Sequence, residues 1–471
     1  MEEIDVSRPP RRTADEEPPS AAVAAPLPPR SASRAGSRRD VAVLWCVNAV
    51  DGLGSQASGL VFPLLLLDLG HGPGTAGVFA SVAAFAGVFF GPLIAVPSDR
   101  GHRRRLMTGS ALTASLAMAG LAVCCLRHPP PWVLLSLALT ERLCATAYET
   151  AARGALSRLA APDDLPRAVA GVQAGDQTAL VAGPALGGVL FGLSRFLPFA
   201  VDAVSYAMAA LGVRAIRTPL DSPSVDVASP GTPLSSPDAS SAPVGKEPLA
   251  SRRPSFGALR AGLAAVVHSP VLRLVLLWSS VASGVLALLF YTAVFVLGTG
   301  AGSATTGGVL AASGAAGMVG SLVAARIVKR FGAHRSLTAA TWLLLPPCAA
   351  LSAADRPWLW GLCFSALCLV LPVVTVVLGG AAVLAVPQDL QSRTGAVLGS
   401  ATAVTAAVAP AVAAALVTWG GPRAPALTCG AVLALLAVHT QRTARTVLRP
   451  AVPGDAHEDT RPAGSSPGSR S

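Results

Sequence analysis

Apolar blocks of about 20 residues dominate the chain, and each block is bounded by a turn or by charge. A helix of about 20 apolar residues is long enough to cross the hydrocarbon core of a lipid bilayer. The composition agrees, because 52% of the residues are hydrophobic, the mean hydropathy is +0.57 and only 13% are charged, against about a quarter in soluble domains. The sequence therefore predicts an all-α polytopic membrane protein. Its twelve expected transmembrane helices cover residues 41–67, 75–97, 106–126, 132–155, 168–192, 197–216, 271–297, 304–328, 336–353, 358–385, 394–418 and 424–441.

Polar segments divide these helices into two sets of six. Residues 1–40 are rich in Pro, Ser, Arg and Glu, and we expect a disordered tail there without a cleavable signal peptide. Residues 217–255 form a Ser/Pro-rich linker that is too polar to fold alone. We expect one six-helix bundle over residues 41–216, a second over residues 256–446, and a disordered tail over residues 447–471.

The basic residues of the short loops predict the orientation of the chain. Basic residues are retained on the cytoplasmic side of a membrane. The expected inner loops carry Arg100, Arg103, Arg104, Arg105, Arg153, Arg158, Arg167, Arg326, Lys329, Arg330, Arg335 and Arg393, and the outer loops carry Arg127, Arg195, Arg356 and Arg423. This excess places both termini, the linker and both tails in the cytoplasm. Since 34 of the 36 basic residues are arginine, as in high-GC bacterial coding, we expect a bacterial plasma membrane.

The charge distribution, the cysteine positions and the absence of certain motifs exclude several other functions. The net charge of +11 does not indicate nucleic-acid binding, because the arginines lie in tails and loops. The eight cysteines lie inside apolar blocks without metal-ligand spacing, so they are expected to act as small hydrophobic residues. The chain has neither an HExxH motif nor the Gly-Lys-Ser/Thr of a phosphate-binding loop. We expect no metal, no cofactor, no ATP drive and no enzymatic activity.

The second expected helix ends in the segment Gly91–Arg105, GPLIAVPSDRGHRRR, which finishes with closely spaced charged residues. Small residues precede it at every fourth position, and such a ridge lets another helix backbone approach closely within a membrane. The ridge consists of Ala83, Gly87, Gly91 and Ala95.

This segment resembles motif A of the major facilitator superfamily, a loop that follows the second helix. The matching residues are Asp99, Arg100, Arg103 and Arg104, whereas Ala95 and His102 stand where the motif has glycine. A carboxylate at this helix end can accept hydrogen bonds from the first amides of a neighbouring helix, here the eleventh near Arg393. The resemblance implies that Asp99 would so hold a cytoplasmic gate shut. The alternative is a solvated helix end that pairs with its own arginines.

The sequence of the second set of helices partly repeats the sequence of the first. A shift of 230 positions aligns the motif A segment with SLVAARIVKRFGAHR, in which Arg330 restores the basic turn and Lys329 replaces the acid. Two parallel six-helix repeats around a central site are the architecture of this superfamily. The resemblance therefore implies two pseudo-symmetric bundles, although an Ala/Gly-rich sequence can also produce such an echo by coincidence.

The fifth expected helix carries GPALGG, which resembles the GPxxGG antiporter motif of the exporters of this superfamily. Its residues are Gly183, Pro184, Gly187 and Gly188. Proline removes a backbone hydrogen bond, and the glycines allow the helix to bend against a neighbour. The resemblance implies that the second helix packs on the eleventh and the fifth on the eighth.

Polar and ionisable residues inside the first six helices are candidates for the transport site, because such residues cost several kcal/mol at mid-bilayer. Asn48, Asp51 and Ser55 form one polar stripe near the middle of the first helix. A proton carrier needs a carboxyl group whose burial favours its neutral form. Asp51 is therefore a candidate proton carrier.

The fourth and fifth helices supply the other charged candidates. Arg142, Glu149 and Arg153 share one side of the fourth helix, and Asp176 lies two turns inside the fifth. Asp176 is a second candidate proton carrier, but the inner vestibule could instead hydrate it. Glu149 and Arg153 are close enough to form a structural ion pair.

The second six helices contain almost no charge, so we expect them to supply a mostly apolar wall for the substrate. Their polar interior residues are Trp278, Ser279, Ser283, Tyr291, Thr292, Thr375, Thr402 and Thr405.

The resemblance is greatest to the drug/proton antiporter branch that includes macrolide efflux proteins, over about residues 41–446. That branch has an acidic residue after the glycine of the first helix, where this chain has Ser55 after Gly54. The expected function is proton-coupled efflux of a small amphiphilic compound by a monomer. The alternatives are proton-coupled import of a small solute and a non-transporting membrane sensor or assembly protein.

Overall fold

A computed structural model describes residues 30–99, 101–127, 129–161, 164–221, 256–386 and 390–447. The side chains of residues 30–37, 95, 97–99, 256–261, 392 and 444–447 lie outside this description. The described part is almost entirely helical. Its helices are α1 (Arg30–Asp68), α2 (Pro73–Asp99), α3 (Arg103–Cys124), α4 (Pro131–Leu159), α5 (Leu165–Leu193), α6 (Leu197–Ala215), α7 (Phe256–His268), α8 (Pro270–Gly300), α9 (Ser303–Phe331), α10 (Ala333–Leu343), α11 (Leu345–Ser352), α12 (Pro357–Ala385), α13 (Gln391–Gly420) and α14 (Ala424–Val447).

These fourteen described helices correspond to the twelve expected transmembrane helices, with two differences from the prediction. The ninth expected helix, 336–353, is divided into α10 and α11 at Leu344, and proline occupies the first turn of α11. Proline at that position lacks an amide hydrogen, which interrupts the helical ladder. The second departure is α7, an additional short helix before α8. Nine of the described helices are individually long and apolar enough to cross a bilayer.

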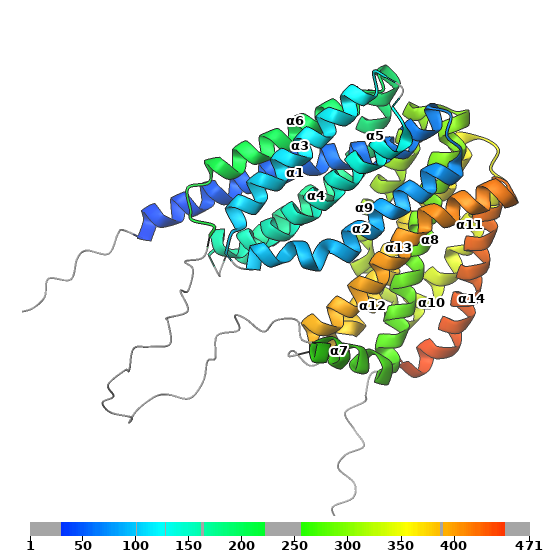
Figure 1. Cartoon of the computed structure of the whole chain (residues 1–471). Coiled ribbons are helices and arrows are strands. Elements are labelled where there is room, and N and C mark those ends of the chain that lie inside the picture. The colour runs from blue at the N-terminus through cyan, green and yellow to red at the C-terminus, as the bar shows by residue number, and fades with distance from the viewer. Residues whose placement is uncertain are drawn as a thin grey trace, which may run out of the picture.

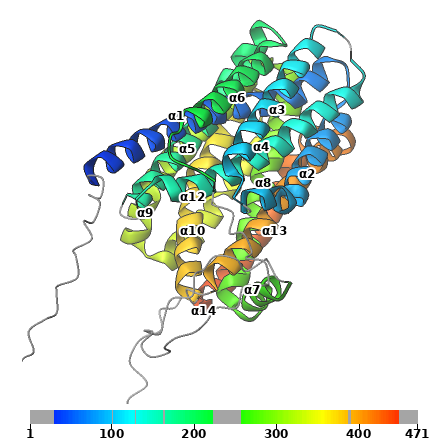
Figure 2. The same cartoon turned by 60° about the vertical axis from the view of Figure 1, so that its left-hand side comes forward.

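Helices α1–α6 and α8–α14 pack as two sets that lie side by side (Figures 1 and 2). Within the first set, α1 packs on α5 and α6, and α3 packs on α4 and α6. Within the second set, α9 packs on α12 and α8 packs on α13. Between the sets, α5 packs on α9 and α2 packs on α13, as the resemblance implies. Of the linker 217–255 that joins the two sets, residues 222–255 lie outside the described residues.

Proline and glycine set the ends of several helices. Pro73, Pro131 and Pro357 each open a helix, where the missing amide hydrogen carries no cost. Gly101 and Gly332 have φ angles of 91° and 80°, a left-handed conformation that favours glycine. The two loops that the sequence aligns as repeats therefore both turn on a glycine. Helix α1 begins at Arg30, inside the stretch that the sequence assigns to the N-terminal tail.

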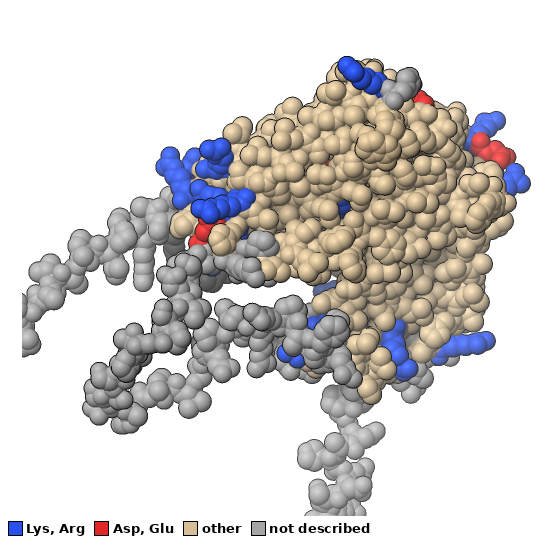
Figure 3. Space-filling view, viewed as in Figure 1, with Lys and Arg blue, Asp and Glu red and all other residues tan. Residues whose placement is uncertain are grey.

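The outer surface is suited to lipid. Large apolar side chains face outward around the whole bundle, and Leu384 and Trp419 are 89% and 86% exposed. Figure 3 shows charged side chains gathered at the two ends of the molecule, with a broad uncharged band between them. A soluble monomer rarely exposes apolar surface on this scale. The band is therefore the surface that the bilayer covers.

The two ends differ in charge and in how closely the two sets approach. We call one the arginine-rich end, defined by Arg103, Arg104, Arg158, Lys329 and Arg330. The opposite, far end carries Asp68 paired with Arg195, and Asp355 paired with Arg423.

At the far end the two sets are in close contact. The Ala411 amide of α13, directly after Pro410, donates a hydrogen bond to Ser81 Oγ of α2 at 3.0 Å. Toward the arginine-rich end, by contrast, a Cβ added at Gly395 or Gly399 of α13 would meet no described atom beyond its own stretch of helix within 4 Å. Figure 3 shows the surface hollowed between the two sets on this side. The structure is thus closed at the far end and open at the arginine-rich end.

Candidate functional site

A cavity of about 450 Å³ lies between the two sets of helices. Helices α1, α2, α3, α4 and α6 form one wall, and α8 and α13 form the other. The first wall contributes the polar side chains Ser55, Ser58, Glu141 and Arg142. The second wall consists of small apolar residues and one aromatic residue, namely Ala287, Ala403, Ala406, Ala407 and Tyr291. The cavity therefore offers charge on one side and a smooth apolar surface on the other.

Tyr206 of α6 joins two of the polar cavity residues. Its hydroxyl donates to Glu141 Oε1 at 2.6 Å and lies 3.0 Å from Ser55 Oγ. A tyrosine hydroxyl has a single proton, so Ser55 is the donor in the second bond. A chain of hydrogen bonds thus runs from α1 through α6 to a carboxyl on α4.

Asp202 of α6 lies behind the cavity wall and is fully buried. Ser58 donates to its Oδ2 at 2.5 Å, and Ser205 donates to its Oδ1 at 3.0 Å. A Cβ at Gly54 would collide with this carboxyl and with the Ser205 hydroxyl. A side chain at position 54 would displace both groups, because the carboxyl packs directly against the backbone of α1.

Asp51 lies beside the same group of residues. One of its oxygens, Oδ1, is buried and has no hydrogen-bond partner among the described residues. Asp51 lies close enough to Asp202 and Glu141 for their charges to interact. On the same stripe, Asn48 Oδ1 accepts a bond of 3.1 Å from the Tyr148 hydroxyl. The predicted stripe of Asn48, Asp51 and Ser55 thus faces α4 and α6 inside the first set of helices.

Within the described residues, none of these three carboxyls pairs with a basic side chain. Neither do any three His, Cys, Asp or Glu side chains there come close enough to hold a metal ion. A charged group in the membrane interior costs several kcal/mol unless it is paired or neutralised. Asp51, Glu141 and Asp202 are thus groups whose ionisation would depend on access to water. We call them the acid cluster.

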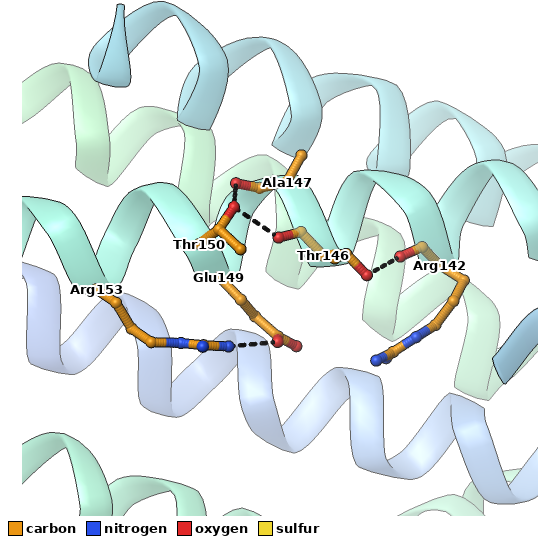
Figure 4. A network of polar contacts seen from close by, with 6 residues as sticks. All are labelled: Arg142, Thr146, Ala147, Glu149, Thr150 and Arg153. Carbon is orange, nitrogen blue, oxygen red and sulfur yellow. Dashed lines mark hydrogen bonds and ion pairs between the residues drawn. The ribbon is translucent and has the colours of Figure 1, made fainter. Parts of the chain in front are cut away.

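Three charged residues of α4, namely Arg142, Glu149 and Arg153, lie along one side of the helix (Figure 4). Arg153 Nη2 and Glu149 Oε2 are 3.3 Å apart, and their side chains are 74% and 48% exposed. An exposed pair of this kind contributes about 0.3–0.5 kcal/mol. Arg142 lies two turns away along the same side and reaches the cavity. Glu149 and Arg153 thus form the ion pair that their spacing predicts. Arg142 is not part of this pair and lines the cavity instead.

Asp176 does not join the acid cluster. It is exposed on α5, and it makes no hydrogen bond or ion pair with another described residue. The sequence made it a second candidate proton carrier after Asp51, with hydration by the inner vestibule as the alternative. The structure separates the two, because the rest of the acid cluster comes from α4 and α6.

The residues of the predicted gate are only partly described. Arg100 lies outside the described residues, as does the side chain of Asp99. Arg103 packs over Gly154 of α4, and the Arg330 guanidinium lies 5.6 Å from the centre of the Phe331 ring. Both of these contacts lie within one set of helices. The predicted contact of Asp99 with α13 remains a prediction.

Arg104 is bonded to the segment that follows α6. Its guanidinium donates to the carbonyl oxygens of Ile216 and Thr218, the second at 3.1 Å. Its amide donates to Asp221 Oδ1 at 3.0 Å. Asp40 of α1 holds the same segment, because it accepts from the amide and the hydroxyl of Thr218 at 2.8 and 2.6 Å. This motif A arginine therefore fixes the start of the linker to the first set of helices.

The glycines of GPALGG lie at two helix contacts, the first of which is with α1. A Cβ at Gly183 would collide with Gln56, and one at Gly187 would lie 2.5 Å from the Ala57 carbonyl oxygen. Neither position has room for a side chain. Both glycines thus allow α5 and α1 to touch through their backbones.

The second contact joins the two sets at the far end. A Cβ at Gly188 would lie 2.5 Å from the Ser303 carbonyl oxygen and 3.0 Å from Gly307 Cα of α9. In the opposite direction, a Cβ at Gly307 would collide with the Pro184 carbonyl oxygen. The crossing of α5 and α9 is therefore a direct contact between backbones.

The polar residues expected inside the second set have different positions. Tyr291 lines the cavity. Trp278 is buried in the core of the second set, where its indole donates to Thr440 Oγ1 at 2.7 Å. Ser283 joins α8 to α13 through the Thr402 carbonyl oxygen at 3.1 Å. Of the eight polar residues expected inside the second set, only Tyr291 lines this cavity.

Five residues of the site were missed from the sequence, namely Ser58, Glu141, Asp202, Ser205 and Tyr206. Glu141 and Asp202 carried a usable signal, because each is an acid inside an apolar block. The serines and the tyrosine carried none, since hydroxyl groups occur throughout apolar helices without a role in transport.

The model for the family described as the Major Facilitator Superfamily matches residues 44–399. No curated protein matches the chain. Among solved structures, a bacterial homologue of the human lysosomal transporter Spinster, inward-facing and unoccupied, aligns with a TM-score of 0.61 at 14% identity, over 88% of this chain and 98% of that chain.

Two further solved structures have the same arrangement of helices. A bacterial homologue of the iron transporter ferroportin, in an inward-facing state, aligns with a TM-score of 0.59 at 14% identity over 85% of this chain and 99% of that one. The human organic anion transporter MFSD10 aligns with a TM-score of 0.56 at 18% identity over 86% and 99%. At these low sequence identities, the similarity to the three solved structures supports a shared fold only.

Proposed function

Because the chain belongs to the Major Facilitator Superfamily and is therefore a membrane transporter, we propose that it exports a small amphiphilic compound in exchange for protons. In this proposal the two sets of helices, residues 41–216 and 256–446, rock about the cavity between them. The protein acts as a monomer in a bacterial plasma membrane.

The observation that supports coupling to protons best is the acid cluster at the cavity. Glu141 lines the cavity, and Asp202 lies directly behind the cavity residue Ser58. Neither forms an ion pair with a basic described residue, but Arg142 lies close enough to Glu141 for their charges to interact. Asp202 has no such basic neighbour among the described residues, so a proton is its simplest counter-charge. Asp51, one turn from Ser55 on α1, extends the cluster toward the arginine-rich end. These three carboxyls take up protons when the cavity opens outward and release them when it opens inward.

The proposed orientation places the arginine-rich end in the cytoplasm, because basic loops are retained there. The open side of the structure then faces inward. The Spinster and ferroportin homologues carry inward-facing states in their descriptions, which is consistent with this assignment. A substrate would enter from the cytoplasm, contact Arg142 and Tyr291, and leave after the far end opens.

Export is favoured over import by the resemblance of GPALGG to the antiporter motif and by its place at the contact between α5 and α9. In this proposal Pro184 and Gly188 form the contact about which α5 moves on α9, while Gly183 and Gly187 hold α5 against α1. Asp99, Arg100, Arg103, Arg104 and Arg330 belong to the cytoplasmic gate that closes when the far end opens.

A reconstituted assay tests the proposal. Purified protein is placed in liposomes with an imposed pH gradient, and movement of the lipophilic probe ethidium is followed by fluorescence. Exchange predicts that ethidium moves against the proton flow, and that Asp202→Asn abolishes this movement. Asp355→Asn is the matched control, because Asp355 is an exposed acid at the far end.

Three outcomes are distinguishable. Movement of ethidium with the protons would establish import in place of export. Unchanged pH-driven transport in both Asp202→Asn and Asp51→Asn would overturn the role of the acid cluster. Absence of proton-linked movement of ethidium, and of the macrolide erythromycin as a second probe, would favour the sensor or assembly alternative.

A further inference from the structure

A second cavity, of about 310 Å³, lies at the arginine-rich end and is separate from the transport cavity. It is formed by the start of α1, the end of α4 and the start of α5. Its charged lining residues are Arg38, Arg167 and Asp164, so its formal charge is positive by one. The proposed function uses none of these residues.

The floor of this cavity is apolar and rigid. Trp45 of α1 lies against Gly171 of α5, where any Cβ would collide with the indole ring. The indole nitrogen donates to the Ala168 carbonyl oxygen at 3.0 Å. Val41 and Ala42 complete the floor along α1. Tryptophan is enriched at the level of the lipid headgroups, where one side of the ring is apolar and the other is wet.

The height of the cavity in the membrane follows from its arginines. The apolar stretch of α1 begins at Val41, three residues after Arg38, and Arg167 stands at the start of α5 directly before the buried residue Ala168. Both side chains are exposed. The two arginines thus mark the boundary at which apolar helix gives way to water, which is where lipid phosphates lie.

The start of α5 adds a second attraction for an anion. No side chain caps this helix, and no acidic residue occurs in its first turn. Uncapped amides at a helix start carry a partial positive charge and bind phosphate groups. Asp164, the residue before the helix, is the single acid in the lining and reduces this attraction without cancelling the two arginines.

We propose that this cavity binds the phosphate headgroup of an anionic membrane lipid. Arg38 and Arg167 hold the phosphate from α1 and α5, while the lipid glycerol and upper acyl chain lie over Val41 and Trp45. Basic pockets between transmembrane helices bind anionic headgroups in this way. The bound lipid joins α1 to α5 within the first set of helices. The inference does not depend on what the protein transports.

The test measures lipid binding by the purified full-length protein in detergent. Phosphatidylglycerol, phosphatidylcholine and inorganic phosphate are titrated separately, with retained lipid counted by native mass spectrometry and the melting temperature recorded. We expect phosphatidylglycerol to be retained and to raise the melting temperature, and the other two to have little effect. In the double variant Arg38→Gln/Arg167→Gln, binding of phosphatidylglycerol should weaken about 25-fold, since each arginine contributes about fivefold at an anionic surface.

Two further variants keep the test decisive. Ala42→Phe fills the cavity without a change of charge and should also abolish selective retention. Arg214→Gln removes an exposed arginine at the same end that does not line the cavity, and it should bind as the parent does. Equal retention of the two lipids, unchanged binding in the double variant or in Ala42→Phe, or an equal stabilisation by inorganic phosphate would each overturn the proposal.

Discussion

The crossing of α5 and α9 allows a direct test of how the far end opens. In Gly188→Ala, the new Cβ would lie 2.5 Å from the Ser303 carbonyl oxygen, although ordinary contact begins at 3.4 Å. The shortfall is 3.4 − 2.5 = 0.9 Å, and the opposing atoms belong to the backbone of α9. Backbone atoms cannot rotate away as a side chain can, so the two helices must separate.

The expected effect is a change in the balance between conformations. Overpacking of a close contact costs about 1–3 kcal/mol. This cost falls only on the state in which the far end is closed, because the clash is absent once α5 and α9 move apart. The ratio of closed to open protein should therefore fall by about 5-fold to 150-fold.

Spin-label distances measured by double electron–electron resonance report this ratio. Suitable label positions are Trp132 of α4 and Trp358 of α12, which are exposed at the far end on opposite sets of helices. The labels would be introduced as Trp132→Cys and Trp358→Cys in a Cys46→Ser background, since Cys46 is the exposed cysteine among those described. The parent should give one short distance, and Gly188→Ala should add or favour a longer one.

Gly192→Ala is the matched control. It lies one turn further along α5, and its Cβ would make an ordinary contact of 3.5 Å with Ser303 Oγ. Both substitutions increase the helix propensity of α5 by about 1 kcal/mol, so that contribution cancels in the comparison. The reasoning fails if Gly188→Ala shows the distances of the parent, or if Gly192→Ala shifts them equally.

Two further predictions concern hydrogen bonds. Tyr206→Phe leaves the Glu141 carboxyl without its hydrogen-bond donor, at a cost of about 1–3 kcal/mol. The rate of pH-driven ethidium transport should therefore fall, while the equilibrium affinity for ethidium, measured by fluorescence, should stay within about twofold of the parent value. Asp40→Ala removes the acceptor for the amide and hydroxyl of Thr218, which should destabilise the first set of helices by about 2 kcal/mol. The melting temperature of the protein in detergent should therefore fall. An unchanged melting temperature would contradict the assigned contacts.

The length and polarity of the apolar blocks were enough to predict the fold class. Each block has to be a helix because a lipid-facing backbone must satisfy its own hydrogen bonds. The same argument could not reveal α7, which is too short to span a membrane, or the break at Leu344. That break depends on a local competition between Pro346 and the helical ladder, and an average over 20 residues does not detect it.

The candidate site was predicted in part. Helical spacing placed Asn48, Asp51 and Ser55 on one face, since residues three, four and seven apart share a side of a helix. It could not say which helices that face meets. The partners Tyr206 and Asp202 come from α6, and their distance from α1 is set by the packing of three helices. The spacing of the α5 glycines similarly predicted a close contact, whereas the identity of α9 as the partner followed only from the resemblance.

The hydrogen bond between Ser81 and the Ala411 amide has a consequence for the order of events during opening. Once α2 and α13 separate, that amide loses its acceptor on α2. A water molecule can replace Ser81 only if it reaches the seam as the helices part. Hydration of this seam and separation of the helices should thus occur together, and a more apolar seam would slow the passage between the two access states.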